Sequence, residues 1–241
     1  MTIEQANEQL QTAGFAIIPK LYTQPELGSL LHCIESAPVA SPNFRRSQEV
    51  FAIRNLLGEI AALWSLLDTS NLRDLLNELF PAGCHLTKAI YFDKPAQSNW
   101  LVAWHQDLMV NVDRRADNLP GFGPWTTKAG WVAVQPPAVV LENTVTIRLH
   151  LDDCDATNGA LKVVPGSHQR GVVPAETITS YTGTATVCAV PAGGAMLMKP
   201  LLLHASNRST SDQPRRVIHL EFSAVELPAG LAWRERQAVE N

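Results

Sequence analysis

The sequence predicts one mainly β domain with flanking helices, in which a β-sandwich or barrel-like jelly roll forms the core. Apolar residues recur at helical spacing through most of the first 83 residues, and from residue 84 they alternate in short runs divided by glycine- and proline-rich turns. A chain of 241 residues suits one such domain. We therefore expect residues 1–241 to form a single domain, with 1–83 as a mostly helical N-terminal support and 84–224 as the jelly-roll core.

The composition is typical of a globular protein with a substantial core, because 46% of the residues are hydrophobic and 17% are charged. A net charge of -4 argues against a nucleic-acid partner. No apolar run approaches the roughly 18 residues that a membrane span requires. The N-terminus lacks the basic and apolar regions of a signal peptide, and the four cysteines form no closely spaced pair. We expect a cytoplasmic protein with free thiols and no membrane partner.

The N-terminal support is expected to contain four helices and a strand at Phe15–Ile18. Thr23 and Glu26 have the spacing of a capping box at the start of the second helix. Ser70 is expected to be the N-cap of the last helix, and residues 38–48 are expected to form a loop. The helices are expected at residues 3–10, 24–36, 58–67 and 71–80, and a short extended piece at 51–53.

The core is expected to contain eight short strands. Residues 144–152 alternate most clearly, with apolar side chains at odd positions and polar side chains at even positions. Residues 108–143 form a long irregular connection, which predicts an active-site lid. Trp125 and Trp131 are expected to belong to this lid rather than simply to cover the core. The strands are expected at 86–92, 100–107, 144–152, 160–164, 187–190, 195–199, 201–206 and 216–224, with a polar loop at 169–186 and a polar tail, as a short helix or disordered, after Pro228.

A candidate metal site begins with His105 and Asp107. Residues i and i+2 of a strand point to the same side, so the imidazole and the carboxylate can reach one point together. Two histidines and one carboxylate with open positions form the ligand set of non-haem Fe(II) oxygenases. The third ligand has four candidates, of which His204 is favoured because it ends an apolar strand and is followed by small residues. The four candidates are His150, His168, His204 and His219.

An anion-binding residue is expected close to this third histidine. Arg215 follows His204 by eleven positions and begins the next strand, so two adjacent antiparallel strands would place them a few ångströms apart. A guanidinium fork matches a carboxylate bidentately. Ser206 lies two residues after His204 and shares its face of the strand. By strand parity, Arg216 is expected to point outward.

These residues, together with the segment 158–168 (Asn-Gly-Ala-Leu-Lys-Val-Val-Pro-Gly-Ser-His), resemble the phytanoyl-CoA dioxygenase family over residues 84–224. The resemblance implies a double-stranded β-helix, or cupin-like, core and an enzyme that uses Fe(II), 2-oxoglutarate and O₂. It implies that His105, Asp107 and His204 are the catalytic iron ligands. It also implies four residues near the co-substrate, which are Arg215, Ser206, Lys88 and Gln106.

The resemblance further implies that a C–H bond of a small metabolite is hydroxylated while 2-oxoglutarate is converted to succinate and CO₂. Asp107 favours hydroxylation, because related halogenases have a small residue at this position. We expect Arg148, on the polar face of 144–152, to select an anionic or zwitterionic substrate, with Trp125 as a further contact.

Three alternatives remain open. His150 and Asp152 form a second His-x-Asp pair that could hold the metal instead. The chain could also be a non-catalytic jelly-roll protein that binds a metal or ligand. Finally, it could be a cupin-type metal enzyme that does not use 2-oxoglutarate, which would leave Arg215 without an anion.

Overall fold

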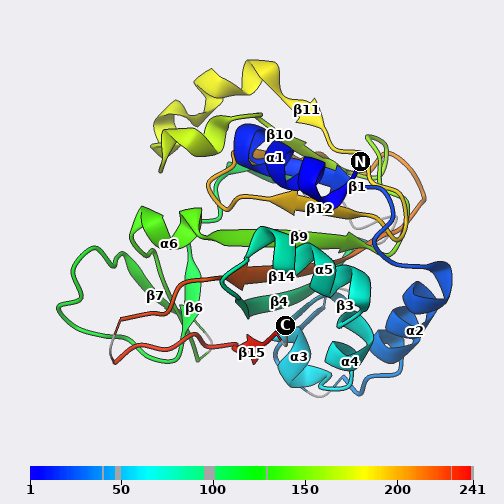
Figure 1. Cartoon of the computed structure of the whole chain (residues 1–241), viewed down its shortest axis with the longest axis horizontal. Helices are drawn as coiled ribbons and strands as arrows, with labels where there is room; N and C mark the ends of the chain where they lie inside the picture. Colours follow the sequence, from blue (N-terminus) through cyan, green and yellow to red (C-terminus); the bar gives the residue numbers. More distant parts are fainter. Residues whose placement is uncertain (40, 47–49, 95–100, 129, 229, 240–241) are drawn as a thin grey trace.

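The computed structural model describes the chain except for residues 40, 47–49, 95–100, 129, 229 and 240–241. Two antiparallel sheets pack against each other, and helices cover the outer face of the larger sheet (Figure 1). The prediction of a mainly β protein with flanking helices and a jelly-roll core is confirmed.

The larger sheet contains eight strands in the order β1-β12-β9-β14-β4-β3-β2, with β15 paired to β4. All seven residues of the central strand β9 are buried, because helices cover its apolar face and the smaller sheet covers its polar face. The polar side chains of this strand therefore point into the molecule. The strands are β1 (Phe15–Ile18), β2 (Phe44–Arg46), β3 (Val50–Arg54), β4 (His85–Lys94), β9 (Thr144–His150), β12 (Ala195–Met198), β14 (Arg215–Ser223) and β15 (Gln237–Ala238).

The smaller sheet has four strands in the order β11-β10-β13-β5, and a third sheet has three strands in the order β6-β8-β7. The strands of the smaller sheet are β5 (Val102–His105), β10 (Leu161–Val163), β11 (Thr186–Val187) and β13 (His204–Ser206). Those of the third sheet are β6 (Val110–Val112), β7 (Trp125–Lys128) and β8 (Trp131–Val134).

Local sequence signals explain the helix ends. Thr23 and Glu26 form the expected capping box, and Thr2 and Gln5 form another at the first helix. Gly14 ends the first helix in the left-handed conformation that glycine tolerates. The helices are α1 (Ile3–Ala13), α2 (Gln24–Glu35), α3 (Leu56–Glu59), α4 (Leu63–Leu67), α5 (Ser70–Leu79), α6 (Ala138–Glu142) and the 3₁₀ helices η1 (Ser167–Arg170) and η2 (Ala175–Thr184).

Several expected elements differ in the structure. The N-cap of α5 is Thr69, whose hydroxyl accepts from the backbone of Leu72, so Ser70 lies one residue too late for that role. The single helix expected at 58–67 is two short helices, α3 and α4. The expected loop at 38–48, of which residues 40, 47 and 48 lie outside the described part of the chain, contains β2, which forms because β3 supplies a partner. The polar segment 169–186 is largely the 3₁₀ helix η2, and the C-terminal tail adds β15 to the larger sheet.

Residues 108–143 are more regular than predicted. They hold the third sheet and α6, which form a lobe at one end of the sandwich (Figure 1). An apolar cluster that includes Val110, Val134 and Leu141 fills the lobe. Trp233 from the C-terminal segment packs into this cluster and pairs with Val112. The third sheet and this cluster give the lobe a core of its own, and its action as a lid stays a prediction.

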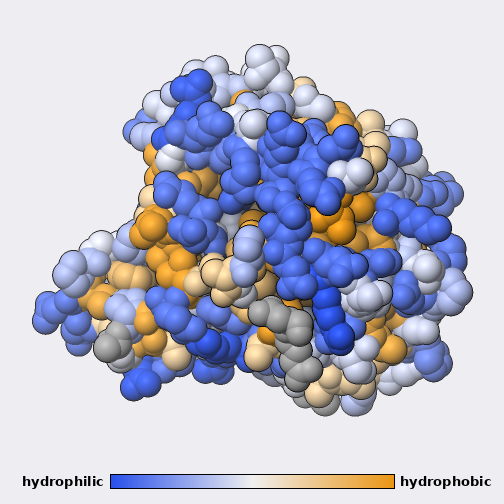
Figure 2. All heavy atoms as spheres, viewed as in Figure 1, coloured by the Kyte–Doolittle hydropathy of each residue, from blue (hydrophilic) through white to orange (hydrophobic). Residues whose placement is uncertain are grey.

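The main apolar core lies between the helices and the larger sheet, where α1, α2, α4 and α5 meet β9, β12 and β14. A second cluster between the two sheets, including Met196, Met198 and Val163, sets their separation. Polar side chains cover much of the helical face, and apolar side chains gather over α6 (Figure 2). Among the described residues, no helix is both long enough and apolar enough to cross a membrane.

Candidate active site

Three potential metal ligands meet at the edge of the smaller sheet. His105 ends β5 and His204 begins β13, and the two residues are directly paired across these neighbouring strands. Asp107 follows two residues after His105, and its backbone N–H donates to Pro200 O at 2.9 Å. One donor atom from each side chain lies within 4.8 Å of the others. In the described part of the chain, this is the one group of three or more His, Cys, Asp or Glu side chains that could hold a metal ion.

The backbone fixes which nitrogen of each histidine faces the aspartate. His105 Nδ1 lies 2.8 Å from Ala103 O, and His204 Nδ1 lies 2.9 Å from Leu202 O. Because a carbonyl oxygen only accepts, each Nδ1 carries a proton, and Nε2 is the nitrogen left to bind a metal. The two Nε2 atoms each lie 3.7 Å from one carboxylate oxygen of Asp107. This spacing leaves room for an ion at about 2.0–2.2 Å from each atom.

The charges around the triad favour the protonation states that a metal needs. Desolvation raises the pKa of the Asp107 carboxyl, but the neighbouring His204, His219 and Lys88 outweigh it and lower the pKa to about 2. Burial lowers the pKa of His204 to about 4, against the opposing effect of Asp107. At neutral pH the carboxylate is therefore ionised and this imidazole is neutral, as metal binding requires.

A pocket of about 130 Å³ adjoins the triad between the two sheets. Arg148 and Arg215 enter it from the larger sheet, and Ser206 enters it from the smaller sheet. Arg148 Nε, Arg215 Nε and Ser206 Oγ are buried and have no hydrogen-bond partner among the described residues. Since buried polar groups are normally paired, these atoms indicate a site for a ligand with acceptor atoms.

This smaller pocket is strongly positive. Burial, and then the charge of Arg215, lower the pKa of Arg148 to about 10. Lys94 does not line this pocket but interacts with the charge of Arg215 beside it. It is 1% exposed and donates to Asn207 O at 2.7 Å, and burial together with Arg215 lowers its pKa to about 8. All three groups remain predominantly cationic at neutral pH, so an anion is the ligand that the pocket stabilises best.

The predicted strand arrangement around Arg215 is wrong. β13 pairs with β5 and β10 in the smaller sheet, whereas β14 pairs with β4 and β9 in the larger one. His204 and Arg215 therefore line the same pocket from opposite sheets rather than from adjacent strands.

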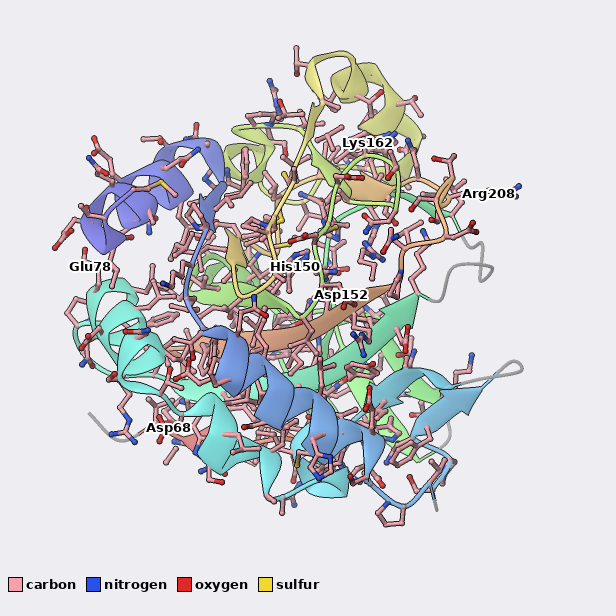
Figure 3. The ribbon with its side chains drawn as sticks, turned by 90° about the vertical axis from the view of Figure 1, so that its right-hand side faces the viewer. Asp68, Glu78, His150, Asp152, Lys162 and Arg208 are labelled. Carbon is pink, nitrogen blue, oxygen red and sulfur yellow. The ribbon has the colours of Figure 1, made fainter. Side chains whose placement is uncertain are left out.

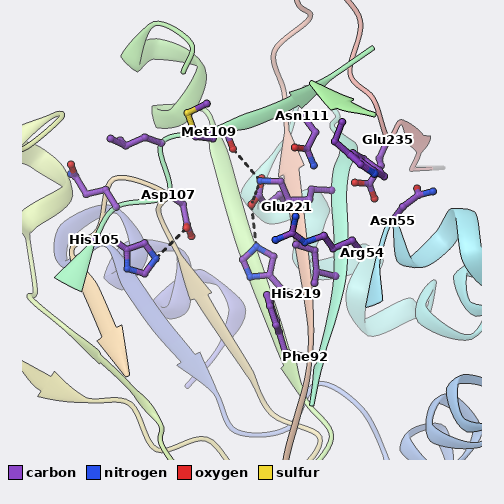
Figure 4. Close-up of a pocket in the computed structure, with 15 residues that line it drawn as sticks. Arg54, Asn55, Phe92, His105, Asp107, Met109, Asn111, His219, Glu221 and Glu235 are labelled. Carbon is purple, nitrogen blue, oxygen red and sulfur yellow. Dashed lines mark hydrogen bonds and ion pairs between the residues drawn. The ribbon is translucent and has the colours of Figure 1, made fainter. Parts of the chain in front are cut away.

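A larger pocket of about 380 Å³ lies on the other side of His105 and Asp107 (Figure 4). Lys88 lies here, where its Nζ donates to Glu221 Oε1 at 2.8 Å and to Met109 O at 3.1 Å. His219 and Phe92 line both pockets. The far wall is formed by Arg54, Asn55, Asn111, Trp131 and Glu235.

Two other predicted residues have different surroundings from those of the triad. The Gln106 side-chain amide donates through Nε2 to Gly171 O and Leu201 O, and it accepts through Oε1 from Val173 N. These hydrogen bonds connect the segment around His105 to the chain before His204. Trp125 packs against the apolar cluster of the lobe and is not among the residues that line either pocket.

The second His-x-Asp pair does not form a metal group in the described residues. Asp152 is held by Arg216, with Oδ1 2.7 Å from NH2 and Oδ2 2.9 Å from Nε, which also places Arg216 away from the pockets. His150 lies near Asp152 at the end of β9 (Figure 3) and is buried, and neither ring nitrogen has a partner among the residues that the structure describes. His168 contacts Gln11 O at the end of α1.

Sequence reasoning missed three charged residues of the larger pocket, which are Arg54, Glu221 and Glu235, and also Lys94, which lies near Arg215 beside the smaller pocket. Lys94 lies six positions after Lys88 on β4, and Glu221 lies six positions after Arg215 on β14, so period-two counting along each strand could have found both. Glu235 comes from the polar tail, where no local pattern indicated that its carboxyl would accept from Ala89 N at 3.0 Å.

A jelly roll with two histidines and a carboxylate beside a basic pocket defines a candidate mononuclear metal enzyme. The phytanoyl-CoA dioxygenase (PhyH) family matches residues 10–217. The chain belongs to this family.

Solved structures of similar fold include AviO1 from Streptomyces viridochromogenes Tue57, with a TM-score of 0.69 at 19% identity over 94% of this chain and 97% of that one. EctD from S. alaskensis, solved with 2-oxoglutarate and 5-hydroxyectoine, has a TM-score of 0.71 at 18% identity over 93% and 77%. EvdO2 from Micromonospora carbonacea, complexed with 2-oxoglutarate, has a TM-score of 0.64 at 18% identity over 96% of each chain.

A similar sequence occurs in Rv1501 of Mycobacterium tuberculosis, an uncharacterized protein that is 35% identical over 80 residues. The match covers 33% of this chain and 29% of that protein.

Proposed function

We propose that the protein is an Fe(II)- and 2-oxoglutarate-dependent dioxygenase that hydroxylates an unactivated C–H bond of a small metabolite. 2-Oxoglutarate would be converted to succinate and CO₂. One observation supports this above all others: a two-histidine, one-carboxylate group lies next to a buried basic pocket. The Arg215, Arg148 and Ser206 side chains of this pocket have polar atoms that find no partner in the described part of the chain. The similar solved structures of EctD and EvdO2 both contain 2-oxoglutarate, in EctD together with 5-hydroxyectoine.

The residues present fit both groups. His105, Asp107 and His204 would hold Fe(II) through two Nε2 atoms and a carboxylate, in the protonation states described above. When bound, Fe(II) and 2-oxoglutarate together supply the activation of O₂. Arg215 would bind the far carboxylate of 2-oxoglutarate, with Ser206 donating beside it.

We infer that Arg148 serves the co-substrate rather than the substrate. This residue lines the smaller pocket and lies outside the larger one, so its charge is available to the co-substrate rather than to the substrate. The larger pocket, the natural place for a substrate, carries both cations and carboxylates. A small polar metabolite with groups of both charges suits it best.

Two other functions are less well supported. A non-catalytic relative would be expected to lose a metal ligand or Arg215, whereas both histidines, the aspartate and the arginine are present around one pocket. A cupin-type enzyme without 2-oxoglutarate would leave the cations of the smaller pocket without an anion. The four cysteines are free thiols, which supports a reducing, cytoplasmic compartment.

The test is Fe(II)-dependent binding and turnover of 2-oxoglutarate, followed as succinate formation with pools of small metabolites. Arg215→Lys should weaken 2-oxoglutarate binding by about tenfold or more, because an ammonium cannot replace the guanidinium fork. Arg216→Lys is the matched control on the outer side of the same strand and should bind as wild type does. His204→Ala should abolish turnover with iron supplied. Wild-type protein that neither binds nor consumes 2-oxoglutarate would refute the proposal.

A further inference from the structure

A chain of four hydrogen-bonded polar side chains, of which three are buried and Lys88 is half-buried, connects the two pockets. Arg148 Nη1 lies 3.0 Å from His219 Nδ1, and His219 Nε2 lies 3.1 Å from Glu221 Oε1. Glu221 Oε1 also accepts from Lys88 Nζ at 2.8 Å. Lys88 then donates to Met109 O, two residues after Asp107, and Figure 4 shows the links from Met109 to His219.

The hydrogen-bonding chemistry of Arg148 and Glu221 determines which ring nitrogen of His219 carries the proton. A guanidinium has only donors, so His219 Nδ1 must accept from Arg148. His219 Nε2 must then carry the proton, which it donates to the Glu221 carboxylate. The imidazole is neutral in this arrangement, and every hydrogen bond of the chain has one donor and one acceptor.

A neutral acceptor orients Arg148 without cancelling its charge. A carboxylate in place of His219 would hold the guanidinium equally well, but it would neutralise the pocket that has to attract an anion. The negative charge of Glu221 is instead matched by Lys88 at 2.8 Å. Phe92 supports the same geometry, because its ring meets the His219 ring edge-on at 87° and lies 5.9 Å from the Arg148 guanidinium carbon.

We propose that His219 is a positioning residue for co-substrate binding, held as the neutral Nε2–H form by Glu221 and Lys88 so that it aims the full charge of Arg148 into the smaller pocket. Arg148 is thereby a second guanidinium for the dicarboxylate, in addition to Arg215. This inference rests on the proposed function, because it needs 2-oxoglutarate as the ligand of that pocket.

Binding of 2-oxoglutarate to the Zn(II)-loaded protein, measured by calorimetry, tests the role of His219. His219→Phe should weaken binding by about tenfold, the effect expected from losing one charge-assisted hydrogen bond. His219→Asn should restore binding to near the wild-type value, because its Oδ1 can accept from Arg148 at the position of Nδ1. Arg148→Met should weaken binding at least as much as His219→Phe, and the double variant should bind no worse than Arg148→Met alone.

His85→Phe is the matched control, because His85 is as buried as His219, at 6% exposure each, and lines neither pocket. It should bind 2-oxoglutarate as the wild type does. A second readout is independent of any variant: ¹⁵N spectra of the imidazoles in the wild-type Zn(II) protein should show His219 protonated at Nε2 and unprotonated at Nδ1.

The outcomes separate the two proposals. Wild-type protein that does not bind 2-oxoglutarate would contradict the proposed function. Wild-type binding with equal affinity in His219→Phe and His85→Phe, or a proton found on His219 Nδ1, would overturn the positioning role alone.

Discussion

The carboxyl of Glu235 should make the stability of the protein depend on pH. This side chain is 8% exposed, and burial raises its pKa from 4.5 to about 7, although Ala89 N donates to it. A group whose pKa is raised in the folded state adds stability that is fully present below its unfolded pKa and is lost as the pH rises through its folded pKa. Each tenfold change in proton affinity is about 1.4 kcal/mol, so Glu235 contributes at most about 3 kcal/mol in this way.

Glu235→Gln isolates this contribution, because the amide oxygen can still accept from Ala89 N and carries no titrating proton. The unfolding free energy of wild type minus that of the variant, from urea denaturation, should fall by about 2 to 3 kcal/mol between pH 5 and pH 8. Glu226→Gln is the control from the same C-terminal segment, where the carboxylate is exposed and paired with Arg236. A difference for Glu235→Gln that stays constant over this pH range would refute the reasoning.

Three further predictions concern the framework of the site. Gln106→Leu leaves Gly171 O, Leu201 O and Val173 N without their partner and should lower the unfolding free energy by about 2 to 3 kcal/mol in urea denaturation; an unchanged midpoint would contradict this. Gly14→Ala should lower the unfolding free energy by at least about 1 kcal/mol, because residue 14 has a φ of 82° and an added Cβ would clash with His168 Nδ1. A variant that unfolds at the same temperature as the wild type would contradict this. Zn(II) at a hundred times its dissociation constant should stabilise the wild type by about 2.7 kcal/mol but give much less protection to His204→Ala; equal protection of both proteins would place the ion elsewhere.

The triad was accessible to sequence reasoning because its geometry is mostly local. His105 and Asp107 share a face through the two-residue period of extended chain, and the small residues after His204 were a further local clue. The family resemblance joined these two segments. The role of Lys88 is harder to predict from the sequence. Whether its ammonium group pairs with a carboxylate or faces the co-substrate depends on which strand lies beside β4. Glu221 supplies that carboxylate from 133 positions along the chain.

Pairing between distant segments also explains the other differences. β2 lies in a polar stretch with two prolines and forms because β3 satisfies its backbone groups. β15 likewise forms because it pairs with β4, and Trp233 supplies part of the core of the lobe at 108–143. None of these contacts leaves a periodic signal in the segment that makes it.

Because of this topology, the two sheets supply different parts of the candidate site. All three candidate metal ligands lie on or directly after strands of the smaller sheet, whereas Arg148, Arg215, His219 and Glu221 come from β9 and β14 of the larger one. The smaller sheet can therefore hold a metal without the larger sheet, but the basic pocket exists only where both sheets pack together. Val163, Met196 and Met198 in the cluster between the sheets set that separation. Metal affinity and co-substrate affinity should accordingly respond to different parts of the core, even though their ligands meet within one pocket.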